Sequence, residues 1–74
     1  MEHPLIERNP QIMLGKPVIK GTRITVELLI RKLAEGFTVN DVLDMYPHLT
    51  LEQVQAAFAY AADKIANDII VEAA

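Results

Sequence analysis

The chain has 74 residues, a formal net charge of −3, no cysteine and 51% hydrophobic residues. A chain of this length forms a single domain, residues 1–74, and buries only about 60% of the surface that its unfolded form exposes. The lack of cysteine excludes disulfides and thiolate metal sites. We therefore expect a second copy of the chain, in a homodimer, to complete the core.

The sequence carries no targeting or membrane signal. It contains no run of about 18 apolar residues that could span a membrane. The N-terminus is acidic and leads into no apolar segment, unlike a signal peptide. We therefore expect a cytoplasmic protein with no membrane partner.

Charge is unevenly distributed along the chain. Residues 1–37 carry a net positive charge and residues 38–74 a net negative charge. Such a split is typical of a protein with two different partners, but small proteins also segregate charge without any partner.

Residues 1–24 hold three of the four prolines and two of the three glycines, which excludes a long helix. Short extended segments are expected at residues 5–6, 12–14 and 18–19, the last of them facing Ile24 across the turn 20–22. Gly21 supplies the positive φ of that turn. The pattern predicts two short strands around a turn.

The first helix is predicted by apolar residues with a helical period. They occur at Val26, Leu29, Ile30, Leu33 and Phe37. Thr25 is placed to cap the start, Glu27 and Arg31 form a favourable i,i+4 pair, and Gly36 suits the left-handed residue after the end.

The second and third helices repeat one capping pattern. Thr38 and Asp41 begin one helix, Pro47 ends it, and Thr50 and Gln53 begin the next. Hydrophobic staples are expected between Phe37 and Val42 and between Leu49 and Val54. We assign three helices to residues 25–68 and a tail to residues 69–74, although no Gly or Pro stops the third helix there. The fold class is mostly α, a three-helix bundle with short N-terminal strands.

The last two helices, joined by Pro47-His48-Leu49, have the spacing of a helix-turn-helix. Many helical hairpins that never contact DNA have the same spacing. The pattern therefore leaves open whether this pair of helices binds DNA.

Two parts of the sequence resemble the family catalogued as domain of unknown function 433. The first is Asn9-Pro10 with Gly15-Lys16-Pro17-Val18-Ile19-Lys20-Gly21-Thr22-Arg23-Ile24, and the second comprises residues 34–37, 41–50, 54–57 and 60–63. The resemblance spans about residues 5–64. It implies a homeodomain-like or winged helix-turn-helix fold. It also implies a prokaryotic antitoxin of the VapB-like type, encoded beside a PIN-like ribonuclease toxin.

Lys16, Lys20 and Arg23 are the first candidates for DNA contact, because cations on a turn reach phosphates. An alternative for Arg23 is a structural ion pair with an acid of its own fold or of a second subunit. On the third helix, Gln53, Gln55 and Tyr60 are candidates because we expect them on its outward face. Glutamine can also pair bidentately with adenine.

Other features of the third helix argue against DNA contact. The helix lacks arginine, and Glu52 and Asp63 repel phosphate. Tyr60 and the neighbouring alanines could form the dimer seam instead.

The acidic and apolar C-terminal part suits a helix that inserts into a partner's groove. We assign Ile65, Asp68, Ile69 and Ile70 to toxin binding, with packing in the dimer as the alternative.

No enzymatic activity, cofactor or metal is expected. The chain has no serine or cysteine, and Thr25, Thr38 and Thr50 are assigned as caps, so no nucleophile–base set can be composed. The carboxylates Asp41 and Asp44 could bind Mg²⁺, but a capped helix with a solvated side is the better interpretation.

These features together predict a dimeric antitoxin. It would repress its own promoter DNA and block a PIN-like ribonuclease toxin. The alternative is a protein-interaction module that binds its partner without touching DNA.

Overall fold

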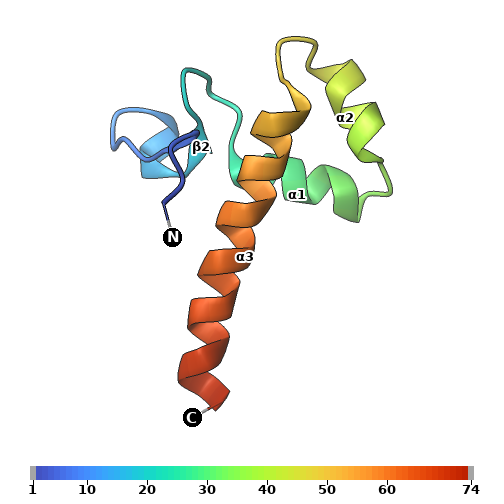
Figure 1. Ribbon diagram of the computed structural model, residues 1–74. Coiled ribbons are helices and arrows are strands. Elements are labelled where there is room, and N and C mark those ends of the chain that lie inside the picture. The colour runs from blue at the N-terminus through green and yellow to red at the C-terminus, as the bar shows by residue number, and fades with distance from the viewer. Residues whose placement is uncertain (1, 74) are drawn as a thin grey trace.

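The structure, a computed structural model, describes the backbone of residues 2–73 and the side chains of residues 2–67. Two short strands and a 3₁₀ turn precede three helices, which confirms the mostly α fold class (Figure 1). The elements are β1 (Ile6–Glu7), η1 (Met13–Gly15), β2 (Val18–Ile19), α1 (Val26–Ala34), α2 (Val39–Met45) and α3 (Leu51–Ala73). None of the described helices is long and apolar enough to cross a membrane.

The two strands form an antiparallel pair, with Ile6 opposite Ile19. The predicted turn after β2 is present: the Ile19 N–H donates to the Ile24 carbonyl at 2.9 Å, and Gly21 has a φ of 81°. Because β1 and β2 are antiparallel, residues 8–17 between them reverse the direction of the chain.

The extended segment predicted at residues 12–14 is wrong, because η1 stands there. The Asn9 side chain accepts the N–H of Gln11 at 2.9 Å, and the Asn9 carbonyl accepts the N–H of Ile12 at 2.9 Å. These bonds close a turn that a strand cannot contain. Met13 and Leu14 then take left-handed φ values of 49° and 59°.

The predicted start of α1 is confirmed by its cap. The Thr25 hydroxyl accepts the N–H of Leu28 at 2.9 Å, which satisfies one of the donors that a helix start leaves open. Beyond the last turn, Gly36 has a φ of 102°, as the left-handed position after the helix requires.

The capping boxes of α2 and α3 are also confirmed. Thr38 and Asp41 exchange backbone and side-chain bonds of 2.9 and 3.1 Å, and Thr50 and Gln53 do the same at 2.9 and 3.2 Å. The helix α2 ends at Met45, two residues before the proline, as the steric restriction on the preceding residue demands.

A small core joins β2 to the three helices. The side chains of Ile19, Leu29, Val42 and Val54, one from each of β2, α1, α2 and α3, are 0% exposed. Several residues of the apolar period of the first helix remain exposed, among them Ile30 at 38% and Phe37 at 40%. The single chain therefore leaves apolar surface uncovered.

The helix α3 is the longest element, with 23 residues and a length of about 35 Å. It leaves the body of the molecule and ends far from the α2–α3 turn (Figure 1). The tail assigned to residues 69–74 is therefore a correction, because residues 69–73 continue α3. No helix-breaking residue interrupts this stretch, so the helix propagates.

Candidate functional site

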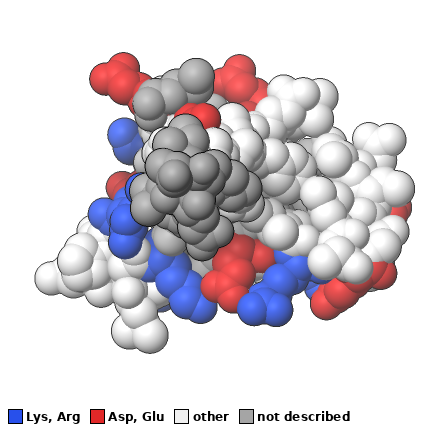
Figure 2. All heavy atoms as spheres, turned by 90° about the horizontal axis from the view of Figure 1, so that it is seen from below, with Lys and Arg blue, Asp and Glu red and all other residues white. Residues whose placement is uncertain are grey.

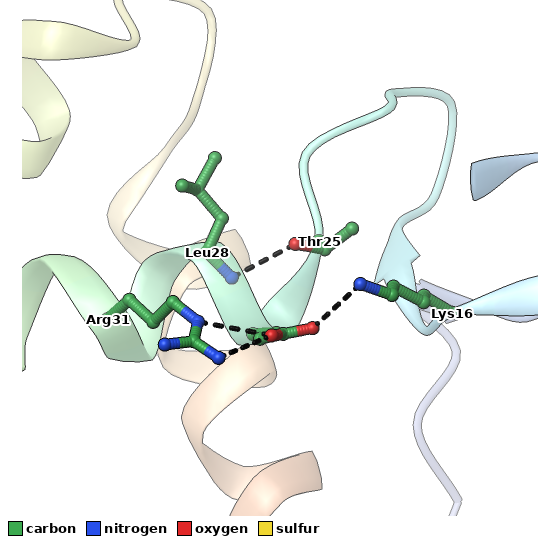
Figure 3. A network of polar contacts seen from close by, with 5 residues as sticks. Lys16, Thr25, Leu28 and Arg31 are labelled. Atoms are coloured by element: carbon green, nitrogen blue, oxygen red, sulfur yellow. Dashed lines mark hydrogen bonds and ion pairs between the residues drawn. The ribbon is translucent and has the colours of Figure 1, made fainter. Parts of the chain in front are cut away.

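Lys16 belongs to an ionic network that ties the segment before β2 to α1 (Figure 3). Its Nζ lies 3.1 Å from Oε1 of Glu27, and the Arg31 guanidinium donates to Oε2 of the same carboxylate at 2.9 and 3.1 Å. The hydrogen bond from Lys16, followed by that from Arg31, lowers the pKa of the Glu27 carboxyl. Lys16 is thus engaged by a carboxylate, which weakens the case for it as a phosphate ligand.

Lys20 and Arg23 lie on the turn between β2 and α1, and both are exposed. Among the side chains that the structure describes, neither forms an ion pair. The alternative of an intramolecular partner for Arg23 therefore has no support within residues 2–67. Their turn and the start of α3 lie at the end of the molecule opposite the C-terminus of α3 (Figure 1).

The two glutamines of α3 differ in their availability. The Oε1 atom of Gln53 accepts the N–H of Thr50 at 2.9 Å, so this amide is committed to the cap. Bidentate pairing with adenine needs both the oxygen and the nitrogen of an amide. Gln55 is exposed and remains available, while the exposed Glu52 lies three residues before it.

The Tyr60 side chain packs against the core, so it is not a freely exposed side chain that could contact a DNA base. Its ring meets the ring of His3 edge-on with 5.3 Å between centroids, and the ammonium of Lys64 lies 5.6 Å from the Tyr60 centroid. His3 Nε2 in turn lies 2.7 Å from a carboxylate oxygen of Asp63. This cluster holds the N-terminal segment on α3, which disfavours Tyr60 as a DNA contact.

An open groove of about 500 Å³ lies between α1 and α3. Its apolar lining comes from both helices, and charged residues stand among the lining side chains. They are Pro17, Val26, Glu27, Ile30, Arg31, Ala34, Tyr60, Ala61, Lys64 and Ile65. From the C-terminal side of α3, acidic and basic side chains mix along one edge of the molecule beside a broad uncharged area (Figure 2).

Sequence reasoning did not find the groove. The sequence indicated only that the alanines near Tyr60 could form a contact surface. The groove itself depends on how α1 and α3 cross, which the sequence pattern does not show. The cluster of His3 with Asp63 was also missed, since the two residues are 60 positions apart.

The candidates for toxin binding are only partly described. Ile65 lies at the groove and is 56% exposed. The side chains of Asp68, Ile69 and Ile70 lie outside the described residues, so their assignment stays a prediction.

No group of three or more His, Asp or Glu side chains that could hold a metal occurs within the described part of the chain. Asp41 is occupied as a cap: the backbone N–H of Thr38, then the Thr38 hydroxyl, lower the pKa of its carboxyl. A carboxylate with these bonds already serves the helix start.

Comparisons with known proteins agree on one group of relatives. The family model described as "Protein of unknown function (DUF433)" matches residues 6–61. An uncharacterised protein of Sinorhizobium fredii, y4eO, is 33% identical over 57 residues, which are 77% of this chain and 26% of that protein. The chain thus spans about a quarter of the length of this curated relative.

A solved structure gives the same result for the fold. The crystal structure of a DUF433 member protein from Anabaena variabilis is 30% identical and superimposes with a TM-score of 0.76. The similarity covers 89% of this chain and 68% of the Anabaena chain. Neither relative's name states a ligand, a partner or an activity.

Proposed function

The chain belongs to the DUF433 family, and on that premise we propose that it is the DNA-binding antitoxin of a toxin–antitoxin pair. One observation carries the DNA-binding half of this proposal. Lys20 and Arg23 are exposed on a turn at the same end of the molecule as the α2–α3 pair, and no described acid pairs with them.

The candidate residues make two kinds of DNA contact, one to phosphates and one to a base. Lys20 and Arg23 contact phosphates, which gives affinity and orientation without reading sequence. Gln55, the glutamine of α3 that is not committed to the cap, reaches a base edge in the major groove. Glu52 opposes this approach, so a single copy binds weakly and two copies on a palindromic promoter supply the affinity.

The antitoxin half of the proposal rests on charge and on α3. Residues 38–74 carry a surplus of acids, and α3 continues to Ala73, beyond the body of the fold. An acidic, apolar helix suits a ribonuclease whose RNA-binding site must be basic. The partner we propose is a PIN-like ribonuclease toxin, neutralised in the cytoplasm without any enzymatic activity of this chain.

A mobility-shift assay on the DNA upstream of the gene tests the proposal. We expect a shift at low salt that strengthens when the neighbouring gene product is added. Replacing Lys20 or Arg23 by alanine should weaken binding to all sequences and reduce the slope of log affinity against log salt by about 0.9 per lost phosphate contact.

The matched control is Lys32→Ala, which removes the same charge. Lys32 already lies 3.8 Å from the Glu35 carboxylate and 5.5 Å from the Phe37 ring centroid, so we expect no change in slope. The absence of any shift, with or without the neighbouring product, would remove the DNA-binding half.

A second function is favoured by the groove between α1 and α3. A protein-interaction module that neutralises a partner needs apolar surface and no cationic reading helix, and α3 has Glu52 near its start. Purification of the tagged chain from its host distinguishes the two. A nuclease that copurifies, combined with no DNA shift, supports the second function over the first.

A further inference from the structure

We propose that the groove between α1 and α3 is the surface through which two copies of this chain pair, each copy receiving residues 66–73 of the other copy's α3. The pairing concerns the protein in the absence of DNA and of any toxin. It therefore goes beyond the proposed function and does not rest on it.

The groove has the character of an incomplete helix-packing site. Ile30 and Ile65 are 38% and 56% exposed although both line it, and Ala34 and Ala61 have side chains small enough to admit another helix. A surface of this kind on a chain with so small a core indicates a helical partner rather than a small ligand.

Charge complementarity selects the partner. Lys64 lines the groove and has no ion-pair partner among the described side chains, whereas Glu27 and Arg31 of the lining pair with each other. Residues 66–74 contain Asp68 and Glu72 and no lysine or arginine. The acidic segment and Lys64 therefore attract each other.

The length and composition of the segment also suit a helical contact. Residues 66–73 continue α3 for about 12 Å beyond Ile65, where the groove lining on this helix ends. The segment contains the apolar residues Ile69, Ile70 and Val71, of which Ile69 follows Ile65 by about one helical turn on the same face.

Self-pairing of this kind closes by symmetry. In a two-fold dimer, a contact of residue i with residue j is repeated as j with i. A groove lined by residues 60–65 of α3 that receives residues 66–73 satisfies this rule if the two α3 helices run antiparallel. The axis then passes near Ile65, where the two copies of this side chain meet.

Sedimentation equilibrium of the full chain, without DNA, tests the pairing. We expect the unchanged chain to form a dimer at micromolar concentration. Ile65→Glu places two carboxylates against each other at the axis, so we expect it to lower the dimer affinity by roughly thirtyfold or more. Because Ile65 is more than half exposed in the single copy, the variant should keep its helical circular dichroism.

A charge exchange identifies the occupant as a second copy. Lys64→Glu should weaken the dimer about tenfold, since each dimer contains two such contacts, and adding Asp68→Lys in the same chain should restore it. Lys20→Glu, the same charge change on the β2–α1 turn, is the control and should leave the dimer unchanged.

Three results would overturn the proposal. They are a monomer at about 100 µM, a dimer that Ile65→Glu does not affect, and a groove that only the neighbouring gene product covers. DNA binding by a chain that remains monomeric would overturn the pairing alone and leave the proposed function standing.

Discussion

At the scale of single residues, the strain in η1 stands out. Leu14 is 93% exposed and has a φ of 59°, and Met13 before it is also left-handed. A left-handed residue other than glycine costs about 1–2 kcal/mol. Nothing in the packing of the described chain repays this cost, because the Leu14 side chain contributes little burial.

We expect Leu14→Gly to raise the free energy of unfolding by about 0.5–1 kcal/mol, because relief of the left-handed strain exceeds the added entropy of the unfolded chain. Urea denaturation of the two proteins measures the change. The control is Gly21→Ala, where the φ of 81° should make the opposite substitution destabilising. A less stable Leu14→Gly protein would contradict the strain.

Single residues also show what the sequence could predict. Thr25, Thr38 and Thr50 were assigned as caps correctly, because a cap involves residues three positions apart and depends on local geometry alone. The Glu27–Arg31 pair was correct for the same reason. The bond of Lys16 to Glu27 was not predicted, since it depends on how the N-terminal segment folds back on α1.

At the scale of elements, carboxylates in the first turns of α1 and α2 make the fold sensitive to acid. The pKa values of Glu27 and Asp41 are lowered in the folded protein, by Lys16 and by Thr38 in the first place. Their stabilising contribution is present above the unfolded values of 4.5 and 3.8 and is lost as the pH falls through the folded values.

We therefore expect the free energy of unfolding to fall as the pH drops below about 4.5. Asp41→Asn keeps an oxygen that can cap α2 but removes the titration, so it should flatten this acid limb, as should Glu27→Gln. Asn40→Ala, a neutral change on the same helix, is the control for effects that do not titrate. Thermal unfolding between pH 7 and pH 3 gives the comparison, and an acid limb that persists when both substitutions are combined in one chain would contradict the assignment.

Elements differ in how far the sequence determined them. The three helices were predictable because their apolar period, caps and breakers agree. The strand at residues 12–14 failed because the Asn9 side chain closes a turn, a local competition that periodicity does not register. The tail assigned to residues 69–74 was wrong, because α3 continues to Ala73 and no residue in the sequence marks where it stops.

At the scale of the whole molecule, the two ends of α3 have different surroundings. Its start lies at the same end of the molecule as the turn that carries Lys20 and Arg23 (Figure 1), and residues 60–65 of α3 line the groove. The cationic end and the groove are each formed by elements that are distant in the sequence. The charge distribution and the apolar period of the sequence could therefore suggest that partners bind, but not where on the molecule they bind. Neither Gln53 nor Tyr60 could have been removed from the candidates before the cap and the core were seen.

The proposed pairing also sets a spacing for the proposed DNA contacts. From Ile65 to Leu51, α3 extends about 21 Å, so the two helix starts of a dimer would lie about 40 Å apart. This is near the 34–36 Å of one DNA turn, the spacing expected for half-sites read by a two-fold dimer.

Hydrogen exchange of the chain with and without its upstream DNA shows which end of the molecule contacts DNA. We expect DNA to slow the exchange of amides at residues 20–24 and 50–56 and to leave residues 60–67, at the groove, unchanged. Slower exchange confined to the groove, or no change anywhere under low salt, would contradict the assignment of the cationic end of the molecule to DNA.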